Sequence, residues 1–286
     1  MPSQREGRAL GEHLLQACVR AARVGAEYIR ARTTDLHAID WRTKSRADFV
    51  SDVDTGAEER VTDSLTTDVP DSRVLGEELS PLAASGEGIV FIVDPLDGTT
   101  NFLHGYPAYS VSIAALAGGE TLAGAVLHVP HDALFTARLG GGAHRDGAPI
   151  RVSQIAEPER ALIGTGFPFK HEEYLPPYLP QFARVVTQTA GVRRAGSAAL
   201  DLADVACGRF DAFWELMLAP WDMAAGLLLV REAGGRATDL DGADLAPSHS
   251  AVVASNGVMH AWMMAQLRGG DPVPSSLPLV SPSPSS

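Results

Sequence analysis

Apolar residues follow the helical period in two segments near the N-terminus. The first segment predicts an amphipathic helix over residues 7–32, and the second predicts a helix that ends near Val69 and Pro70. Between them, the polar residues 40–48 indicate an exposed, mobile loop. The apolar positions are Leu10, Leu14, Ala17, Ala21, Val24 and Ile29 in the first helix and Val53, Ala57, Val61 and Leu65 in the second.

Strand-like segments come next along the chain. Residues 89–94 form a continuous apolar run, and residues 109–117, 122–129 and 134–139 are also rich in strand-forming side chains. Short turns that contain glycine or proline join them, which predicts an antiparallel meander. Asp146 and Gly147 mark a further hairpin turn.

The second half of the chain alternates between strand-like and helix-like segments. Gly208 and Gly234 each follow a predicted helix, at the position where glycine often ends one. The predicted strands end near residue 166 and cover 210–214 and 251–255, and the predicted helices cover 174–190, 197–207, 223–233 and 258–267.

This order of elements predicts an α+β half with a mostly antiparallel sheet, followed by a mixed α/β half. Together the two halves should form a layered αβαβα sandwich. We place the N-terminal half at residues 1–150, with the main metal motif, and the C-terminal half at residues 151–268. Residues 269–286 are rich in proline and serine, and we expect them to be a disordered tail.

Composition narrows the range of functions. The 286 residues include 23 Lys and Arg against 35 Asp and Glu, a net charge of −12. This balance argues against direct nucleic-acid binding and against an anionic membrane surface. It does not exclude an anionic substrate, because bound cations can reverse the local sign of a site.

The cysteines and the apolar runs of the chain indicate the cellular compartment to expect. Its two cysteines, Cys18 and Cys207, lie in apolar, helix-like stretches, so free thiols in a reducing compartment are expected. The N-terminus has no signal-like apolar core, and the longest apolar run, Met223–Val230, is too short to span a bilayer. We therefore expect a cytoplasmic enzyme or binding protein.

The most informative segment is the strand over 89–94 and the residues that follow it. Asp94 and Asp97 stand three residues apart, with Pro95 between them and Thr99 close behind. Carboxylates held at a strand end are suitable ligands for a hard cation such as Mg²⁺, which also takes substrate phosphate oxygens. A plain turn between two strands is the alternative interpretation of this segment alone.

Three other acidic residues could also belong to a metal and phosphate site or have an ordinary structural role. Glu77 ends a strand-like stretch, and Asp54 and Asp222 stand at the starts of predicted helices. Taken singly, the two aspartates are typical helix caps, and the glutamate is typical of a solvated strand end. A capping position also lies beside the positive end of a helix, where a phosphate can dock.

Taken together, these segments resemble the signatures of the inositol monophosphatase family. The similarity runs from about Leu14 to Arg268, in order and at family-like spacing. Several long motifs in one chain are specific evidence, which the plain-turn interpretation does not explain. The general family motifs are residues 75–78, 93–102 and 221–226, and residues 164–169 and 193–199 resemble its bacterial branch.

The resemblance implies a site for two to three Mg²⁺ ions. The first ion would be held by Glu77, Asp94 and the backbone carbonyl of Leu96. The second would be held by Asp94, Asp97 and Asp222. Glu77 would also help to hold a weaker third ion, which makes it one of the catalytic residues.

The resemblance also assigns roles around these ions. Thr99, paired with Asp54, would orient the attacking water, and the amides of Gly98 and Thr99 would bind phosphate. Lys44 would lie on a mobile loop over the metals. The family often has one more residue between that lysine and the aspartate that corresponds to Asp54. Substrate would be bound by Asp97, Gly196, Ser197, Ala198 and Glu215.

The chemistry agrees with such a site. Phosphate monoesters hydrolyse so slowly that catalysis needs on the order of 20 kcal/mol of transition-state stabilisation. One general base supplies only about 3–5 kcal/mol, so charge stabilisation and positioning must dominate. Two cations can activate the water and neutralise the leaving alkoxide, which explains a carboxylate-rich site without an evident nucleophilic side chain.

The expected function is therefore Mg²⁺-dependent, lithium-sensitive hydrolysis of inositol monophosphate or a similar small polyol phosphate. One alternative keeps the chemistry but changes the substrate to histidinol phosphate, a sugar phosphate or a nucleotide 3′-phosphate. Another is a partner-binding role on the same fold, for example with the transcription machinery. Relatives suggest a homodimer without membrane association.

Overall fold

A computed structural model describes residues 4–45, 48–80, 88–248 and 250–269 of the chain. Its helices are α1 (Gln4–Arg32), α2 (Asp52–Asp68), α3 (Thr99–Leu103), α4 (Leu175–Val186), α5 (Ala198–Ala206), α6 (Pro220–Glu232) and α7 (His260–Arg268). Short 3₁₀ turns lie at Thr33–Ala38, Pro158–Arg160 and Glu172–Tyr174. Most of the expected proline- and serine-rich tail, residues 270–286, lies outside the described residues.

A seven-stranded sheet forms the centre of the N-terminal half. Its strands follow one another in sequence order, so each packs beside the next along the chain. β3 runs parallel to β4, and the pairs from β4 to β9 are antiparallel, which confirms the predicted meander. The strands are β3 (Arg73–Gly76), β4 (Ile89–Asp97), β5 (Ser110–Ala117), β6 (Glu120–His128), β7 (Ala133–Arg138), β8 (Gly142–Arg145) and β9 (Ala148–Pro149).

A five-stranded sheet forms the second half, with the strand order β11-β10-β12-β14-β13. β10 pairs in parallel with both neighbours, whereas β14 pairs antiparallel with β12 and β13, so the sheet contains both kinds of pairing. The strands are β10 (Leu162–Thr165), β11 (Gly191–Arg193), β12 (Ala212–Leu218), β13 (Arg236–Thr238) and β14 (Ser250–Ser255).

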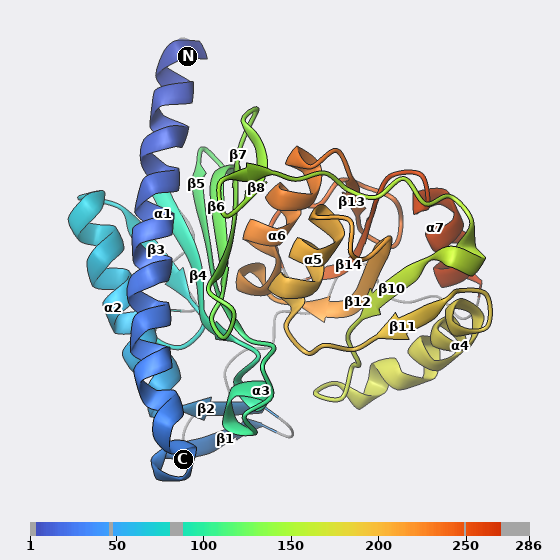
Figure 1. Cartoon of the computed structure of the whole chain (residues 1–286), viewed down its shortest axis with the longest axis horizontal. Coiled ribbons are helices and arrows are strands. Elements are labelled where there is room, and N and C mark those ends of the chain that lie inside the picture. The colour runs from blue at the N-terminus through green and yellow to red at the C-terminus, as the bar shows by residue number, and fades with distance from the viewer. Residues whose placement is uncertain (1–3, 46–47, 81–87, 249, 270–286) are drawn as a thin grey trace.

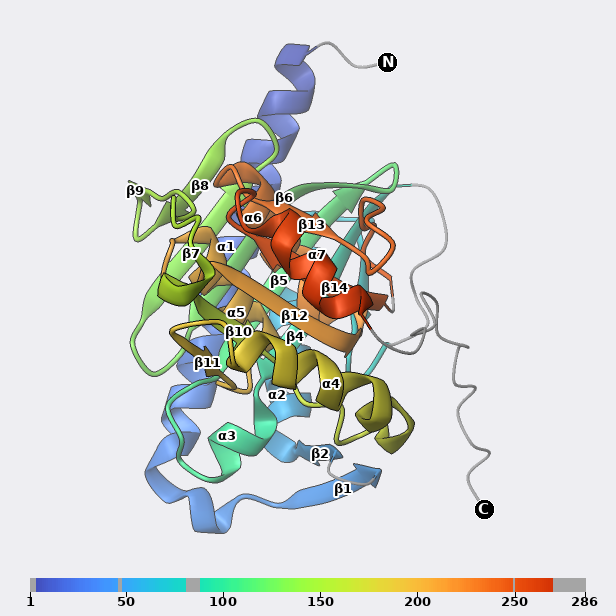
Figure 2. The same cartoon turned by 90° about the vertical axis from the view of Figure 1, so that its right-hand side faces the viewer.

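The two sheets and the helices stack in five layers (Figures 1 and 2). α1 and α2 cover the outer face of the larger sheet, α5 and α6 lie between the sheets, and α4 and α7 cover the outer face of the smaller sheet. One cluster of buried apolar side chains lies under α1 and α2, one surrounds α5 and α6 between the sheets, and one lies under α4 and α7. The predicted αβαβα class is therefore confirmed.

The middle layer explains the apolar run at Met223–Val230. α6 packs against both sheets and α5, so its whole circumference is apolar, as expected for a helix buried on all sides. None of the described helices is both long enough and apolar enough to cross a membrane.

The structure corrects the interpretation of residues 40–48. Instead of a loop, β1 (Trp41–Ser45) and β2 (Asp48–Ser51) form an antiparallel hairpin, with Trp41 opposite Ser51 and Thr43 opposite Phe49. The rings of Trp41 and Phe49 meet edge to face with their centroids 5.2 Å apart. This aromatic contact stabilises strand pairing in a segment whose charged residues concealed its strand character.

Candidate active site

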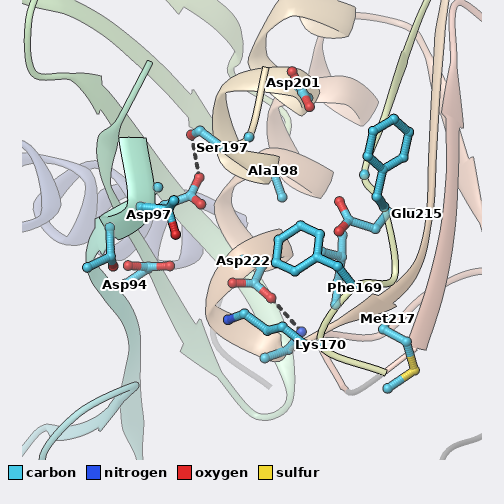
Figure 3. A pocket seen from close by; sticks show the side chains of 18 of the residues that line it. Asp94, Asp97, Phe169, Lys170, Ser197, Ala198, Asp201, Glu215, Met217 and Asp222 are labelled. Atoms are coloured by element: carbon cyan, nitrogen blue, oxygen red, sulfur yellow. Dashed lines mark hydrogen bonds between the residues drawn. The ribbon is translucent and has the colours of Figure 1, made fainter. Parts of the chain in front are cut away.

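A cleft with a volume of about 330 Å³ opens beside the end of β4 and extends to the smaller sheet. Its walls come from the end of β4, the start of α3, the loop after β10, the starts of α5 and α6, and β12. Figure 3 shows acidic side chains from both halves of the chain on its walls. Residues that are distant in sequence therefore meet in one cavity.

Three carboxylates come together at one end of this cleft (Figure 3). Asp94, Asp97 and Asp222 each offer an oxygen, and these oxygens all lie within 4.8 Å of one another. Side chains three positions apart on a regular strand point to opposite faces. The pairing of β4 with β5 shifts register between Asp94 and Asp97, and this irregularity brings both carboxylates to the same centre.

The position of Asp222 follows from the start of α6. Its carboxylate accepts a hydrogen bond of 2.7 Å from the backbone N–H of Ala219. Asp222 is the third residue of α6 rather than its N-cap, which is Ala219, and its carboxylate faces the other two at the same time. Glu77, which follows β3, lines the same cleft but is not part of the closely spaced trio among the described residues.

The three carboxylates strongly oppose one another's ionisation. Burial raises the pKa of Asp94 well above its ordinary value, and the negative charges of Glu77, Asp97 and Asp222 raise it further. Burial also raises the pKa of Asp97 to about 6. Such crowding is stable at neutral pH only when protons or cations intervene. An all-oxygen donor set with this surplus of negative charge fits a hard divalent cation.

The backbone between the aspartates has little freedom. The N–H of Leu96 donates to Asp94 across 2.9 Å, and the carbonyl of Leu96 accepts from the Thr99 hydroxyl across 3.2 Å. Gly98 has a φ of +96°, and a Cβ there would lie 2.8 Å from the carbonyl oxygen of Ala108. Glycine is therefore required at the turn that leads from β4 into α3.

Asp54 and Thr99 form a hydrogen-bonded pair beside the carboxylates. The Thr99 hydroxyl donates to Asp54 across 2.8 Å, and the carboxylate also accepts from the N–H and hydroxyl of Ser51, across 2.8 Å and 2.5 Å. Burial raises the pKa of Asp54 to about 6, despite these hydrogen bonds. The aspartate thus completes the first turn of α2 and holds Thr99 in place.

The other end of the cleft contains the residues predicted to bind the alcohol. Ser197 donates to Asp97 across 2.5 Å and the N–H of Ala199 donates across 2.9 Å, which joins α5 to the end of β4 (Figure 3). Glu215 on β12 faces the cleft, and burial raises its pKa to about 8. Gly196 and Ala198 also line this wall.

The structure adds residues to this wall that the sequence analysis did not assign. The guanidinium of Arg194 lies 4.9 Å from the ring centre of Phe169, and Lys170 and Asp201 also line the cleft. Asp201 is 2% exposed, and its Oδ1 is buried without a hydrogen-bond partner in the described structure. Phe169 and Arg194 lie in the two motifs that resemble the bacterial branch, but no pattern in the sequence indicated that they share a location. The side chain of Lys44, expected over the metals, lies outside the described residues.

Comparison with known proteins places this geometry in a family. The model of the inositol monophosphatase family matches residues 11–270. The Nus factor SuhB of Pseudomonas aeruginosa is 44% identical over 247 residues, which cover 85% of this chain and 91% of that protein. An inositol-1-monophosphatase of Rhizobium meliloti is 40% identical over 243 residues, with the same coverage of 85% and 91%.

A solved structure agrees with these relatives. The crystal structure of the extragenic suppressor protein suhB from Bartonella henselae matches with a TM-score of 0.85 and 39% sequence identity, and covers 89% of this chain and 98% of that one. The fold, the acidic cleft and the extent of these matches lead to one conclusion: the chain belongs to the inositol monophosphatase family.

Proposed function

We propose that this protein hydrolyses small polyol phosphates, inositol monophosphate first among them, with the help of Mg²⁺. One observation carries the proposal: Asp94, Asp97 and Asp222 converge in a cleft that also contains the Asp54–Thr99 pair. Family membership supports a phosphatase, and the Rhizobium meliloti relative is named as an inositol-1-monophosphatase.

The cation would be held by the three aspartates, with Glu77 and the carbonyl of Leu96 as further oxygen donors. When bound, it would neutralise phosphate charge and favour ionisation of a nearby water. We include two to three Mg²⁺ ions and sensitivity to Li⁺ in this proposal.

The remaining residues would bind and orient the reactants. Because Thr99 donates its proton to Asp54, its oxygen can accept a hydrogen bond from a water and direct that water at phosphorus. Attack by the water oxygen forms a new bond to phosphorus and breaks the bond between phosphorus and the substrate oxygen, which takes a proton from solvent water and leaves as the alcohol. Asp54, whose pKa is raised to about 6 by burial, can take up the proton of the water. The backbone N–H groups of Gly98 and Thr99 would bind phosphate.

Polyol recognition would come from the other end of the cleft. The Glu215 carboxylate faces the cavity, and Ser197 and Ala198 stand across from it (Figure 3). Hydroxyl groups of a cyclic polyol can donate to such a carboxylate, which an apolar alcohol could not do. Histidinol phosphate, sugar phosphates and nucleotide 3′-phosphates are the competing substrates.

A panel of these esters tests the proposal directly. Phosphate release should require Mg²⁺, disappear with a chelator, and be fastest with inositol monophosphate. Activity that is unaffected by chelation would overturn the metal-dependent mechanism. If another ester is hydrolysed fastest, the proposed mechanism stands and only the assigned substrate changes.

A second function is favoured by a different observation. The Pseudomonas aeruginosa relative is named a Nus factor, so we propose that this chain also contacts the transcription machinery through a protein partner. The net charge of −12 favours a protein over direct contact with nucleic acid. Capture of RNA polymerase subunits or elongation factors by both the wild type and Asp94→Asn would support a role that does not need turnover.

The remaining expectations from the sequence belong to the proposal as well. They are a cytoplasmic location, a homodimer, and the division into halves at residues 1–150 and 151–268. Sedimentation of the purified protein tests the dimer, and separate expression of each half tests whether either one folds alone.

A further inference from the structure

The segment that carries Glu77 is fixed where it leaves the larger sheet. β3 ends at Gly76, and the N–H of Glu77 donates to the carbonyl of Val93 on β4 across 3.3 Å. The backbone then bends over residues 77–79. Glu77 itself lines the cleft together with the three aspartates.

A buried carboxylate takes over where the strand pairing stops. Glu58 on α2 is 1% exposed, and its Oε2 accepts a hydrogen bond of 2.7 Å from the N–H of Glu78. Its Oε1 accepts a hydrogen bond of 3.0 Å from the N–H of Leu79. Buried backbone N–H groups need an acceptor, and the Glu58 side chain supplies one to each of these two. Glu58 therefore holds the two residues that directly follow Glu77.

The close approach of Glu58 depends on Gly76. A Cβ at residue 76 would lie 2.0 Å from Oε1 of Glu58 and 2.4 Å from its Cδ. Real side chains do not approach so closely, so this glycine leaves the space that the carboxylate fills. The chain before Glu77 and the chain after it thus contact the same side chain.

α2 also carries Asp54, which supports the cleft through its hydrogen bond with Thr99. Asp54 precedes Glu58 by four residues, so the two carboxylates lie on one face of the helix. Asp54 holds Thr99, and Glu58 holds the backbone beside Glu77. One rigid helix therefore supports two neighbouring parts of the cleft.

We propose that Glu58 is a positioning residue for metal binding, which holds the backbone on the C-terminal side of Glu77 so that the Glu77 carboxylate stays at the cation site. This inference rests on the proposed function, in which Glu77 is a metal ligand. Glu58 is not among the described residues that line the cleft, so it would touch neither the cation nor the substrate. It acts through the bonds to Glu78 and Leu79, and it should influence metal affinity more than polyol recognition.

The test compares single substitutions on α2, each made in the full-length protein. Glu58→Ala removes both acceptors, and Glu58→Gln keeps one carbonyl oxygen that can accept one of the two N–H groups. Glu59→Ala is the matched control, because the side chain of Glu59 is exposed on the same helix and makes no hydrogen bond in the described structure. Calorimetric titration with Mn²⁺ measures metal affinity without turnover, and circular dichroism verifies folding at the titration temperature.

We expect Glu58→Ala to weaken Mn²⁺ binding by about 10- to 100-fold. Glu58→Gln should lie between Glu58→Ala and the wild type, and Glu59→Ala should match the wild type. The Mg²⁺ concentration for half-maximal activity should rise in the same order, while KM for the ester at saturating Mg²⁺ stays within about twofold.

The outcomes separate this inference from the proposed function. If the wild type itself binds no divalent cation, the proposed function fails. If the wild type binds Mn²⁺ and folded Glu58→Ala binds it equally well, the positioning role is wrong. If Glu58→Ala does not fold, Glu58→Gln decides: an unchanged affinity overturns the inference and a weaker affinity supports it.

Discussion

The Thr99 hydroxyl donates a hydrogen bond of 2.8 Å to Asp54, a carboxylate 45 residues earlier in the chain. The bond joins the start of α3 to the first turn of α2, so two short turns on separate elements fix each other. Asp54 is 1% exposed, and Ser51 donates to it from the side of α2. The Thr99 oxygen is therefore held in one orientation beside the three aspartates.

Replacement of Thr99 tests this arrangement. Thr99→Ala should lower kcat by about 10²- to 10⁴-fold, the range expected when a group that orients or deprotonates the nucleophile is lost. Its affinity for Mn²⁺ should stay close to that of the wild type, because the aspartates remain. Thr99→Ser keeps the hydroxyl and should retain most activity. Phosphate release under saturating Mg²⁺ measures the rates, and a normal rate for Thr99→Ala would exclude the role in orienting water.

Asp94 should be essential for turnover but not for folding. Asp94→Asn removes a buried charge that three other carboxylates oppose, and it preserves the size of the side chain. We expect no detectable turnover, together with a melting temperature in chelator at least as high as that of the wild type. The exposed Asp63→Asn on α2 serves as the control. A large drop in melting temperature would show that Asp94 is needed to stabilise the metal-free fold.

The metal-free protein should lose stability as pH rises from about 4 to about 6. Burial raises the pKa of both Asp54 and Asp97 to about 6, above an unfolded value of about 3.9. The folded state therefore binds protons more tightly, and the free energy of unfolding falls through this window. Denaturant titrations in chelator at several pH values measure it.

Mg²⁺ should reverse this loss. Cations bind the ionised carboxylates of the folded state, so millimolar Mg²⁺ should raise the melting temperature more at about pH 7.5 than at about pH 5. Thermal melts with Mg²⁺ and with chelator at each pH provide the comparison. A melting temperature that Mg²⁺ does not change at either pH would contradict a metal site in the cleft.

The sequence predicted the elements with strong periodicity and missed those that depend on pairing partners. The long amphipathic pattern defined α1, and the apolar run defined β4, because each element shows its buried face in its own residues. β11 and β13 have three residues each, which is too short for a period to appear. The β1–β2 hairpin depends on the contact between Trp41 and Phe49, which has no signature along the chain.

The same distinction applies to the candidate site. The motif around Asp94 and Asp97 could be recognised because both proposed ligands lie in one short segment. The register shift that turns them to one centre, and the arrival of Asp222, are products of tertiary structure. Glu58 escaped notice for the same reason, since a glutamate in an amphipathic helix resembles any solvated residue until its partners at residues 78 and 79 are known.

Gly166 should determine how tightly the cleft binds the polyol. A Cβ at this position would lie 2.0 Å from the carboxyl carbon of Glu215, so Gly166→Ala must displace that carboxylate from the cavity wall. We expect KM for inositol monophosphate to rise by about three- to tenfold, since a lost hydrogen bond contributes about 0.5–1.5 kcal/mol. Mn²⁺ affinity should remain unchanged, because the atoms nearest to a Cβ at residue 166 belong to Glu215 and not to the three aspartates. Gly7→Ala is the control, since a Cβ there has no neighbour within 4 Å. An unchanged KM for folded Gly166→Ala would show that Glu215 does not hold the substrate hydroxyl.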